Sequence, residues 1–183
     1  MNLYILRHAS AGTRRANPVL DLKRPLDKEG KQQCLRLAHL LNAMKISFDA
    51  VYSSPLKRSL QTAQLVATET GYERQIQSSA ALAPEARFAD FLQLVHQAND
   101  VENILLVGHN PNLQTFLGLL LMWPQREDKG SSAPPLIRLR KGSIARVSLD
   151  RGPATLTTLL DPRVVRTLYA TSTTRSRPKT SRK

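Results

Sequence analysis

The sequence holds one cysteine, Cys34, so no disulfide can form within the chain, and we expect this thiol to be buried in the core. Aromatic residues make up only 5% of the chain. Zinc-ligand, RNP-like and helix-turn-helix signatures are all missing, which argues against a nucleic-acid-binding module. The longest apolar run, residues 116–123, is far shorter than the roughly 20 residues that span a bilayer. No signal peptide opens the chain, so we expect a cytoplasmic protein without a membrane partner.

Acidic residues are scarce beside the basic ones, and the net charge of +13 is unevenly distributed. Residues 162–183 carry seven Lys or Arg and no Asp or Glu, which leaves +6 on residues 1–161. We predict a single domain over residues 1–161, long enough for a substantial core. The remaining residues, 162–183, are expected to be a basic, disordered tail. Nucleic acid is not expected as a partner of the domain, although the tail has the charge to bind polyanions.

Apolar periodicity predicts that strands and helices alternate along the chain. Strands are expected at residues 2–6, 50–53 and 103–107, with a weaker one at 75–77. Helices are expected at residues 28–43, from 55 onward, at 85–98 and from 112 onward, and Ser54 is the expected N-cap of the second. Three β-rich segments follow at residues 136–139, 143–149 and 154–160, with a hairpin turn at 150–152. The order predicts an α/β three-layer sandwich with a mostly parallel central sheet and antiparallel edge strands.

Cationic and imidazole side chains follow three of the predicted strands. Arg7 and His8 follow the first strand, and His109 follows strand 103–107. Arg58 falls in the first turn of the helix after strand 50–53, although a solvated surface arginine would have the same pattern. Ligands of parallel sheets bind beyond the carboxyl ends of the strands, so we expect these four side chains at one rim. Two arginines and two histidines make a cationic pocket suited to a phosphoryl group.

Metal ligation is the competing use of the two histidines. The flanking arginines would repel a cation, and no carboxylate or cysteine nearby has the spacing of a ligand. We therefore expect a site without a metal, and a protein without a cofactor.

Three motifs, in order, resemble those of the histidine phosphatase superfamily. Leu6-Arg7-His8-Ala9 resembles its Arg-His-Gly signature, with alanine in place of glycine. Residues 53–58 followed by 61–63 resemble the second-arginine motif, and residues 107–111 resemble the second-histidine motif. The short chain and Arg24-Pro25-Leu26 resemble the SixA-type phosphohistidine phosphatases in particular. The resemblance covers residues 1–161 and implies a phosphoglycerate mutase-like fold.

The resemblance implies a role for each of the four residues. His8 attacks phosphorus and forms a phosphohistidine intermediate that water hydrolyses. Arg7 and Arg58 hold the equatorial oxygens, and His109 donates a hydrogen bond to the same oxygens. These roles agree with physical chemistry, because an attacking imidazole must be neutral and neighbouring guanidinium groups disfavour its protonation.

Two departures from the family pattern affect the details of the site. Ala9 in place of glycine adds a methyl group that we expect to narrow the site slightly. Many relatives that act on phosphate esters carry a glutamate as the leaving-group acid in the middle of the chain. Glu85 is the candidate general acid, but its spacing does not match the motif, and it also suits the first turn of a helix. Arg24 is a candidate phosphate contact or else an exposed arginine.

The leading hypothesis is a metal-independent phosphatase that hydrolyses phosphohistidine on a protein. The phosphoramidate P–N bond is labile and demands less of a general acid than an alkyl ester does, so a missing acid favours this substrate. The alternative is a phosphatase of the same fold that acts on a small phosphomonoester. A phosphate- or nucleic-acid-binding protein without catalysis is less favoured. A phosphoglycerate mutase is not expected, because the chain lacks the extra segments of those relatives.

Overall fold

A six-stranded sheet forms the centre of the computed structural model, which describes residues 1–98, 100–122, 137–150 and 152–175, with side chains as far as residue 171. The strands lie in the order β3-β2-β4-β1-β5-β6. They are β1 (Asn2–Arg7), β2 (Ala50–Ser53), β3 (Gln77–Ser78), β4 (Asn103–Gly108), β5 (Ile144–Ser148) and β6 (Thr155–Leu160). The first four strands in that order pair in parallel, while β5 and β6 form an antiparallel edge. The predicted α/β class and mixed sheet are confirmed.

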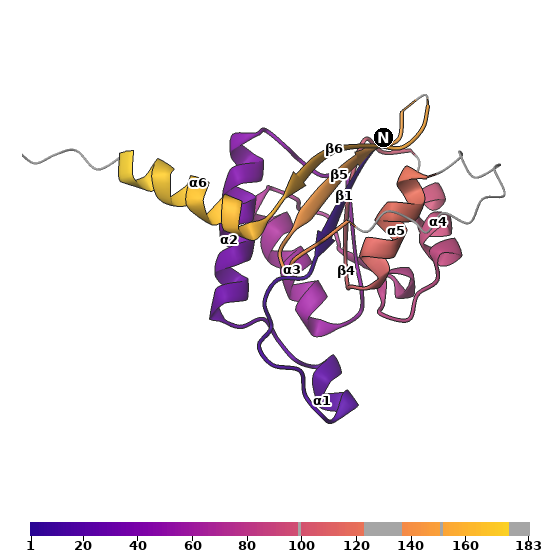
Figure 1. Ribbon diagram of the computed structural model, residues 1–183, viewed down its shortest axis with the longest axis horizontal. Coiled ribbons are helices and arrows are strands. Elements are labelled where there is room, and N and C mark those ends of the chain that lie inside the picture. Colours follow the sequence, from indigo (N-terminus) through magenta and orange to yellow (C-terminus); the bar gives the residue numbers. More distant parts are fainter. Residues whose placement is uncertain (99, 123–136, 151, 176–183) are drawn as a thin grey trace, which may run out of the picture.

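Helices cover both faces of the sheet (Figure 1). They are α1 (Pro18–Leu22), α2 (Lys28–Ala43), α3 (Lys57–Glu69), the 3-10 helix η1 (Ala80–Leu82), α4 (Phe88–Gln97), α5 (Asn112–Leu121) and α6 (Pro162–Arg175). Alternate residues of β1 face opposite layers, as the period of a strand requires. Leu3 and Ile5 pack with α4 and α5, whereas Tyr4 and Leu6 pack with α2 and α3. Cys34 is buried in the second of these layers, as predicted.

Three element boundaries differ from the sequence-based expectation. Helix α3 begins at Lys57 with Leu56 as its N-cap, so Ser54 does not cap it. Helix α4 begins at Phe88 instead of residue 85. Arg87 is its N-cap, and the Arg87 backbone N–H donates to an Asp90 carboxylate oxygen at 3.2 Å. Residues 137–139 are not a strand, because side chains instead of a neighbouring strand bind the carbonyls of residues 137 and 139. Residue 136 of the predicted segment 136–139, and Arg151 of the predicted hairpin turn 150–152, lie outside the described residues.

The prediction of a disordered tail is wrong for Pro162–Arg175, which forms α6. Asp161 accepts the backbone N–H of Arg163 at 2.8 Å at the start of this helix. Val165 is buried, and the ring of Tyr169 lies 5.2 Å from that of His39 on α2. The prediction rested on the basic composition of residues 162–183. Val165 and Tyr169, four residues apart, nevertheless give α6 a face that packs on α2. Among the described residues, no helix is both long and apolar enough to cross a membrane.

The loop after β1 is held tightly against the start of α2. A Cβ on Gly30 would lie 1.9 Å from the carbonyl oxygen of Ser10, so only glycine permits this approach. The carboxylate of Asp27 accepts the Ser10 hydroxyl, the Gly12 N–H and the Gly30 N–H, each at 2.7 Å. This packing fixes the backbone directly after His8.

Candidate active site

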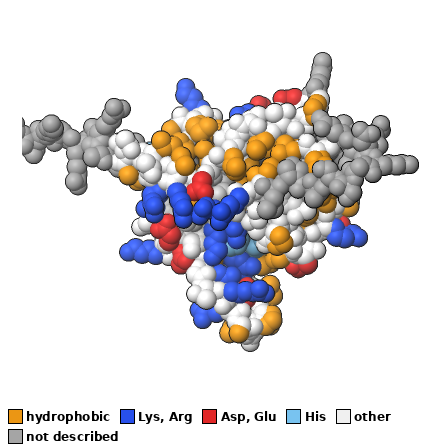
Figure 2. All heavy atoms as spheres, viewed as in Figure 1, with side chains coloured by type: hydrophobic (Ala, Val, Ile, Leu, Met, Phe, Trp, Pro, Cys, Tyr) orange, Lys and Arg blue, Asp and Glu red, His pale blue; other side chains and the backbone are white. Residues whose placement is uncertain are grey.

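Strands β2, β4 and β1 are neighbours in the sheet and run in parallel, so their carboxyl ends meet at one rim. Arg7, His8, Arg58 and His109 line a single cleft of about 920 Å³ at this rim, as the sequence predicts. Figure 2 shows the surface there, with Lys and Arg side chains gathered around a histidine. Arg58 is 6% exposed, which rules out the alternative of a solvated arginine.

His8 is buried, and its hydrogen bond fixes which ring nitrogen is free. Nδ1 lies 2.8 Å from the carbonyl oxygen of Ala9. A carbonyl only accepts, so Nδ1 carries the proton and Nε2 keeps its lone pair. Burial lowers the pKa of His8 to about 3, and the charges of Arg58 and Arg7 act in the same direction. The ring is therefore neutral, with a nucleophilic nitrogen available.

His109 lies beside His8, with ring centroids 4.9 Å apart. Its Nε2 is 2.8 Å from the Ser54 hydroxyl oxygen and 3.1 Å from that of Ser59. Burial lowers the pKa of His109 to about 2, and the nearby His8 and Arg58 act in the same direction. When a serine hydroxyl donates to Nε2, the ring proton lies on Nδ1, and His109 has one N–H to donate.

Sequence reasoning missed both serine partners of His109. Ser54 was assigned to the cap of a helix, but its hydroxyl is 3.4 Å from the Leu56 nitrogen and much closer to His109. Ser59 lies in the first turn of α3, where the sequence carries no signal of a partner on β4. Both contacts are tertiary and join the second-arginine segment to the second histidine.

Arg58, which is buried, and Arg7, which is partly buried, each have an unused hydrogen-bond donor. Arg7 donates from Nη1 to the Leu139 carbonyl at 2.9 Å, and Arg58 donates from Nη1 to the Asp21 carbonyl at 3.0 Å. The Nε atoms of Arg7 and Arg58 are buried without a partner among the described residues. Burial lowers the pKa of each guanidinium, which nevertheless stays charged at neutral pH. Unpaired buried donors are costly, and an anion between the arginines would supply acceptors.

Asp21 of α1 also belongs to the site, although the sequence analysis did not single it out. Its carboxylate lies 2.8 Å from Arg24 Nε and 3.5 Å from Arg58 Nη1. The hydrogen bond from Arg24 is the main cause that lowers the pKa of Asp21 to about 2. The three-residue spacing of Asp21 and Arg24 was a possible sequence signal for their pair. The contact between Asp21 and Arg58 is tertiary, and no sequence signal predicts it.

Arg24 lines the cleft, so the second alternative from the sequence, that Arg24 is an exposed surface arginine, is wrong. Its side chain is 10% exposed, and Nη1 donates to the Ala11 carbonyl at 2.7 Å. These contacts tie α1 to the loop after β1. A direct contact between Arg24 and phosphate stays a prediction.

The two departures from the family pattern have different structural outcomes. Glu85 is exposed and lines the cleft beside Pro84, ahead of α4, so its assignment to a first helical turn is wrong. Its role as a general acid stays a prediction. Ala9 is 1% exposed and packs with the α2 and α3 layer, and the described lining of the cleft does not include it. The expected narrowing by its methyl group is therefore wrong.

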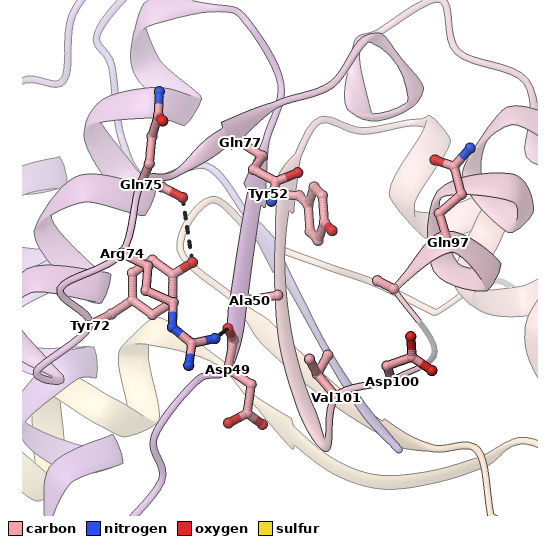
Figure 3. Close-up of a pocket in the computed structure, with 11 residues that line it drawn as sticks. Asp49, Ala50, Tyr52, Tyr72, Arg74, Gln75, Gln77, Gln97, Asp100 and Val101 are labelled. Atoms are coloured by element: carbon pink, nitrogen blue, oxygen red, sulfur yellow. Dashed lines mark hydrogen bonds between the residues drawn. The ribbon is translucent and has the colours of Figure 1, made fainter.

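A separate hollow, of about 440 Å³, lies at the amino end of β2, away from the catalytic cleft (Figure 3). Arg74 donates there to the Asp49 carbonyl at 3.1 Å, and the Tyr72 hydroxyl is 3.4 Å from the Gln75 carbonyl oxygen. Its described lining contains no histidine. The residues that the motifs predict are all in the cleft at the other end of the parallel strands. Across the described residues, no group of three or more His, Cys, Asp or Glu is placed to hold a metal ion.

The depressed histidine pKa values predict that acid destabilises the fold. The unfolded chain binds protons at His8 and His109 below about pH 6.5, whereas the folded chain does so only near pH 3 and 2. The free energy of unfolding should therefore fall as the pH drops below 6.5, by up to roughly 1 kcal/mol per pH unit for each histidine. Urea unfolding at pH 7.5, 6.0 and 5.0 measures this slope.

His109→Gln should lose about half of that slope, because one of the two titrating rings is gone. His96→Gln is the matched control, since His96 is exposed on α4 and should leave the slope unchanged. Equal stability of the wild type at pH 7.5 and 5.0 would contradict the neutral, buried state of both rings.

The arrangement matches proteins of known family. The model of the histidine phosphatase superfamily (branch 1) matches residues 3–83. An uncharacterised protein of the cyanobacterium Picosynechococcus sp. is 34% identical over 146 residues, which are 78% of this chain and 87% of that protein. The family match includes Arg7, His8 and Arg58, while His109 lies beyond it.

Solved structures share the fold at low sequence identity. The protein histidine phosphatase SixA complexed with tungstate has a TM-score of 0.73 and 24% identity, covering 90% of this chain and 99% of that one. The α-ribazole phosphatase of Shigella flexneri has a TM-score of 0.67 and 19% identity, covering 88% and 97%. A phosphoserine phosphatase of Entamoeba histolytica has a TM-score of 0.61 and 18% identity, covering 87% and 96%. These likenesses confirm the predicted phosphoglycerate mutase-like fold.

Proposed function

Because the chain belongs to the histidine phosphatase superfamily, we propose that it is a phosphatase that hydrolyses phosphohistidine on a protein, without a metal, through an intermediate on His8. The observation that carries the proposal is the pairing of a neutral His8 with two arginines, Arg7 and Arg58, whose Nε donors are buried and unused. A nucleophile and an oxyanion clamp are the two parts that phosphoryl transfer requires.

Binding places the phosphoryl group among the cationic donors of the cleft. The Nε atoms of Arg7 and Arg58 donate to its non-bridging oxygens, and the Nδ1–H of His109 donates to the same group. Asp21 contacts Nη1 of Arg58 through its carboxylate and its backbone carbonyl, so that arginine is oriented before substrate arrives. Donors fixed in advance stabilise the charge of the transition state without reorganising.

In the first step, the Nε2 lone pair of His8 forms a bond to phosphorus. The P–N bond of the substrate breaks, and its electron pair stays on the substrate ring, which carries a proton on its other nitrogen and so leaves as neutral imidazole. Positive charge that develops on His8 is stabilised by the hydrogen bond from Nδ1 to the Ala9 carbonyl. In the second step, water attacks phosphorus, the bond to His8 breaks, and inorganic phosphate leaves with His8 neutral again.

The state of Glu85 bears on the choice of substrate. An imidazole leaving group needs less help from a general acid than an alkoxide does, which fits a site whose candidate acid is an exposed residue of the cleft wall. The second candidate function, hydrolysis of a small phosphomonoester, is favoured by the fact that Glu85 does line the cleft. In that case Glu85 would protonate the leaving oxygen.

A substrate comparison in the presence of chelator separates these functions. We expect kcat/KM for a phosphohistidine protein to exceed that for sugar phosphates and p-nitrophenyl phosphate by at least about 100-fold, and Glu85→Gln to leave it unchanged. Glu73→Gln, an exposed glutamate after α3, is the matched control. Faster turnover of a sugar phosphate, lost only in Glu85→Gln, would support the ester phosphatase instead. Binding without any turnover would mean a non-catalytic protein.

A further inference from the structure

A second basic hollow, of about 640 Å³, adjoins the catalytic cleft at the start of α6. Arg7 and Lys141 line both spaces. The other lining residues of the second hollow are Glu29, Gln33, Arg140, Pro162, Arg163 and Arg166. In Figure 2, Lys and Arg side chains form a band from the start of α6, past a histidine, to α1. The positive surface therefore extends well beyond what one phosphoryl group requires.

Not all cations of the second hollow are free to bind a ligand. Arg140 is paired with Asp161 at 3.0 Å. The acidic lining residue, Glu29, lies 3.8 Å from Arg36. Within the described part of the chain, Lys141, Arg163 and Arg166 take part in no ion pair. We call these three residues the flank cluster.

The flank cluster is held in place by the packing of α6. Arg163 and Arg166 are three residues apart and so lie on one face of the helix. Val165, which lies between them in sequence, is buried, so the face of α6 that carries Val165 points toward the rest of the domain. Arg163 and Arg166 are exposed and line the hollow. Lys141 lies two residues after Leu139, whose carbonyl accepts from Arg7, and it lines the catalytic cleft as well as the hollow, so the cluster lies next to the phosphate clamp. Three unpaired cations concentrate positive potential and attract an anion.

We propose that the flank cluster binds acidic side chains next to the phosphorylated residue of the protein substrate. This inference rests on the proposed function and specifies its substrate. Arg163 and Arg166 are exposed, whereas Arg58 of the phosphate clamp is buried and Arg7 is partly buried. Exposed arginines suit a carboxylate on a partner's surface, while a small anion gains most from donors that enclose it. A ligand that fills both spaces carries a phosphoryl group and a second negative charge.

Two phosphohistidine peptides that differ only in glutamate or glutamine on the flanks test the proposal. For the wild type we expect KM to be about fivefold lower for the glutamate peptide, with kcat unchanged, because each exposed ion pair contributes modestly. The difference should shrink from 0.05 to 0.5 M NaCl as the charges are screened. The double variant Arg163→Gln/Arg166→Gln should erase it and leave p-nitrophenyl phosphate turnover unchanged.

A charge-matched control removes the same two positive charges elsewhere. Lys45→Gln/Arg74→Gln changes residues at the far end of α2 and in the hollow at the amino end of β2. This control should keep the preference for glutamate. Equal KM values for the two peptides in the wild type at low salt, or loss of the preference in both double variants, would overturn the proposal.

Stable phosphonate analogues of the two peptides separate this inference from the proposed function. If neither phosphohistidine peptide is turned over, the proposed substrate is wrong, but the Kd values of the analogues still test the cluster. Tighter binding of the glutamate analogue in the wild type alone supports it, and equal Kd values overturn it. If Arg163→Gln/Arg166→Gln weakens tripolyphosphate binding and not that of the glutamate analogue, the occupant is a small polyphosphate and the proposal is wrong.

Discussion

His8→Ala is expected to lower kcat by at least about 10⁴-fold, the scale found when a catalytic nucleophile is removed. The neutral ring with its free Nε2 is the group that forms the covalent bond, and its loss also removes the phosphoenzyme. Rapid quenching of the wild type with labelled substrate should give an acid-labile, alkali-stable phosphoenzyme. The variant should give none. His96→Ala, an exposed histidine on α4, is the matched control.

Two buried serines, Ser54 and Ser59, contact His109 Nε2 and are the pairs to examine if activity persists. Ser54 is fully buried, with its hydroxyl 2.8 Å from His109 Nε2, so a serine-histidine pair lies next to the cleft. Substantial turnover in His8→Ala, with an acid-stable phosphoserine in place of phosphohistidine, would show that a serine beside His109 is the nucleophile, and its loss in Ser54→Ala or in Ser59→Ala would identify which one. Ser10 and Ser53 lack a histidine partner in the described structure, since Ser10 donates to Asp27 and Ser53 to the Ser54 carbonyl.

Local pattern predicts the elements that carry the site. Strand 50–53 and helix 28–43 match the observed bounds of β2 and α2. In both, the periodicity of the side chains coincides with one buried face, so pattern and packing agree. The rule for the carboxyl ends of parallel strands then places Arg7, His8, Arg58 and His109 at one rim. Each of these residues ends or directly follows a strand, or lies in the first turn of a helix, so the elements fix where its backbone lies.

The partners of those residues could not be predicted in the same way. Asp21 meets Arg58 across 37 positions of sequence, and Ser59 meets His109 across 50. Such contacts depend on how loops fold onto the sheet, which no local period describes. The prediction for the segment that forms α6 was wrong for another reason, because composition averages over all the residues of a segment. The single buried face at Val165 and Tyr169 outweighs the surrounding charge.

Arg58→Gln is expected to lower kcat/KM by about 10² to 10³-fold, the effect of removing one preorganised donor to a developing charge. Glutamine can place a neutral N–H near the position of the Arg58 Nε, but it lacks the positive charge and both Nη groups of the guanidinium. Arg58→Lys keeps the charge but not the planar fork, so it should recover only part of the loss. Inhibition by inorganic phosphate should weaken in the same order. Arg87→Gln, an exposed arginine on the opposite layer, is the matched control.

The contacts of Asp21 make this prediction more specific. Asp21→Asn removes the carboxylate beside Arg58 but leaves the backbone carbonyl that accepts from Nη1, so Arg58 should be misplaced without being lost. We expect a loss of about tenfold or less in kcat/KM. If Asp21 acts by orienting Arg58, its substitution should cost almost nothing once Arg58→Gln is present, and the two effects should not add. Additive losses would show that Asp21 does not act through Arg58. An Arg58→Gln variant within tenfold of the wild type would show that Arg58 is not the clamp, because a guanidinium that binds the transferring phosphoryl group must affect its transition state.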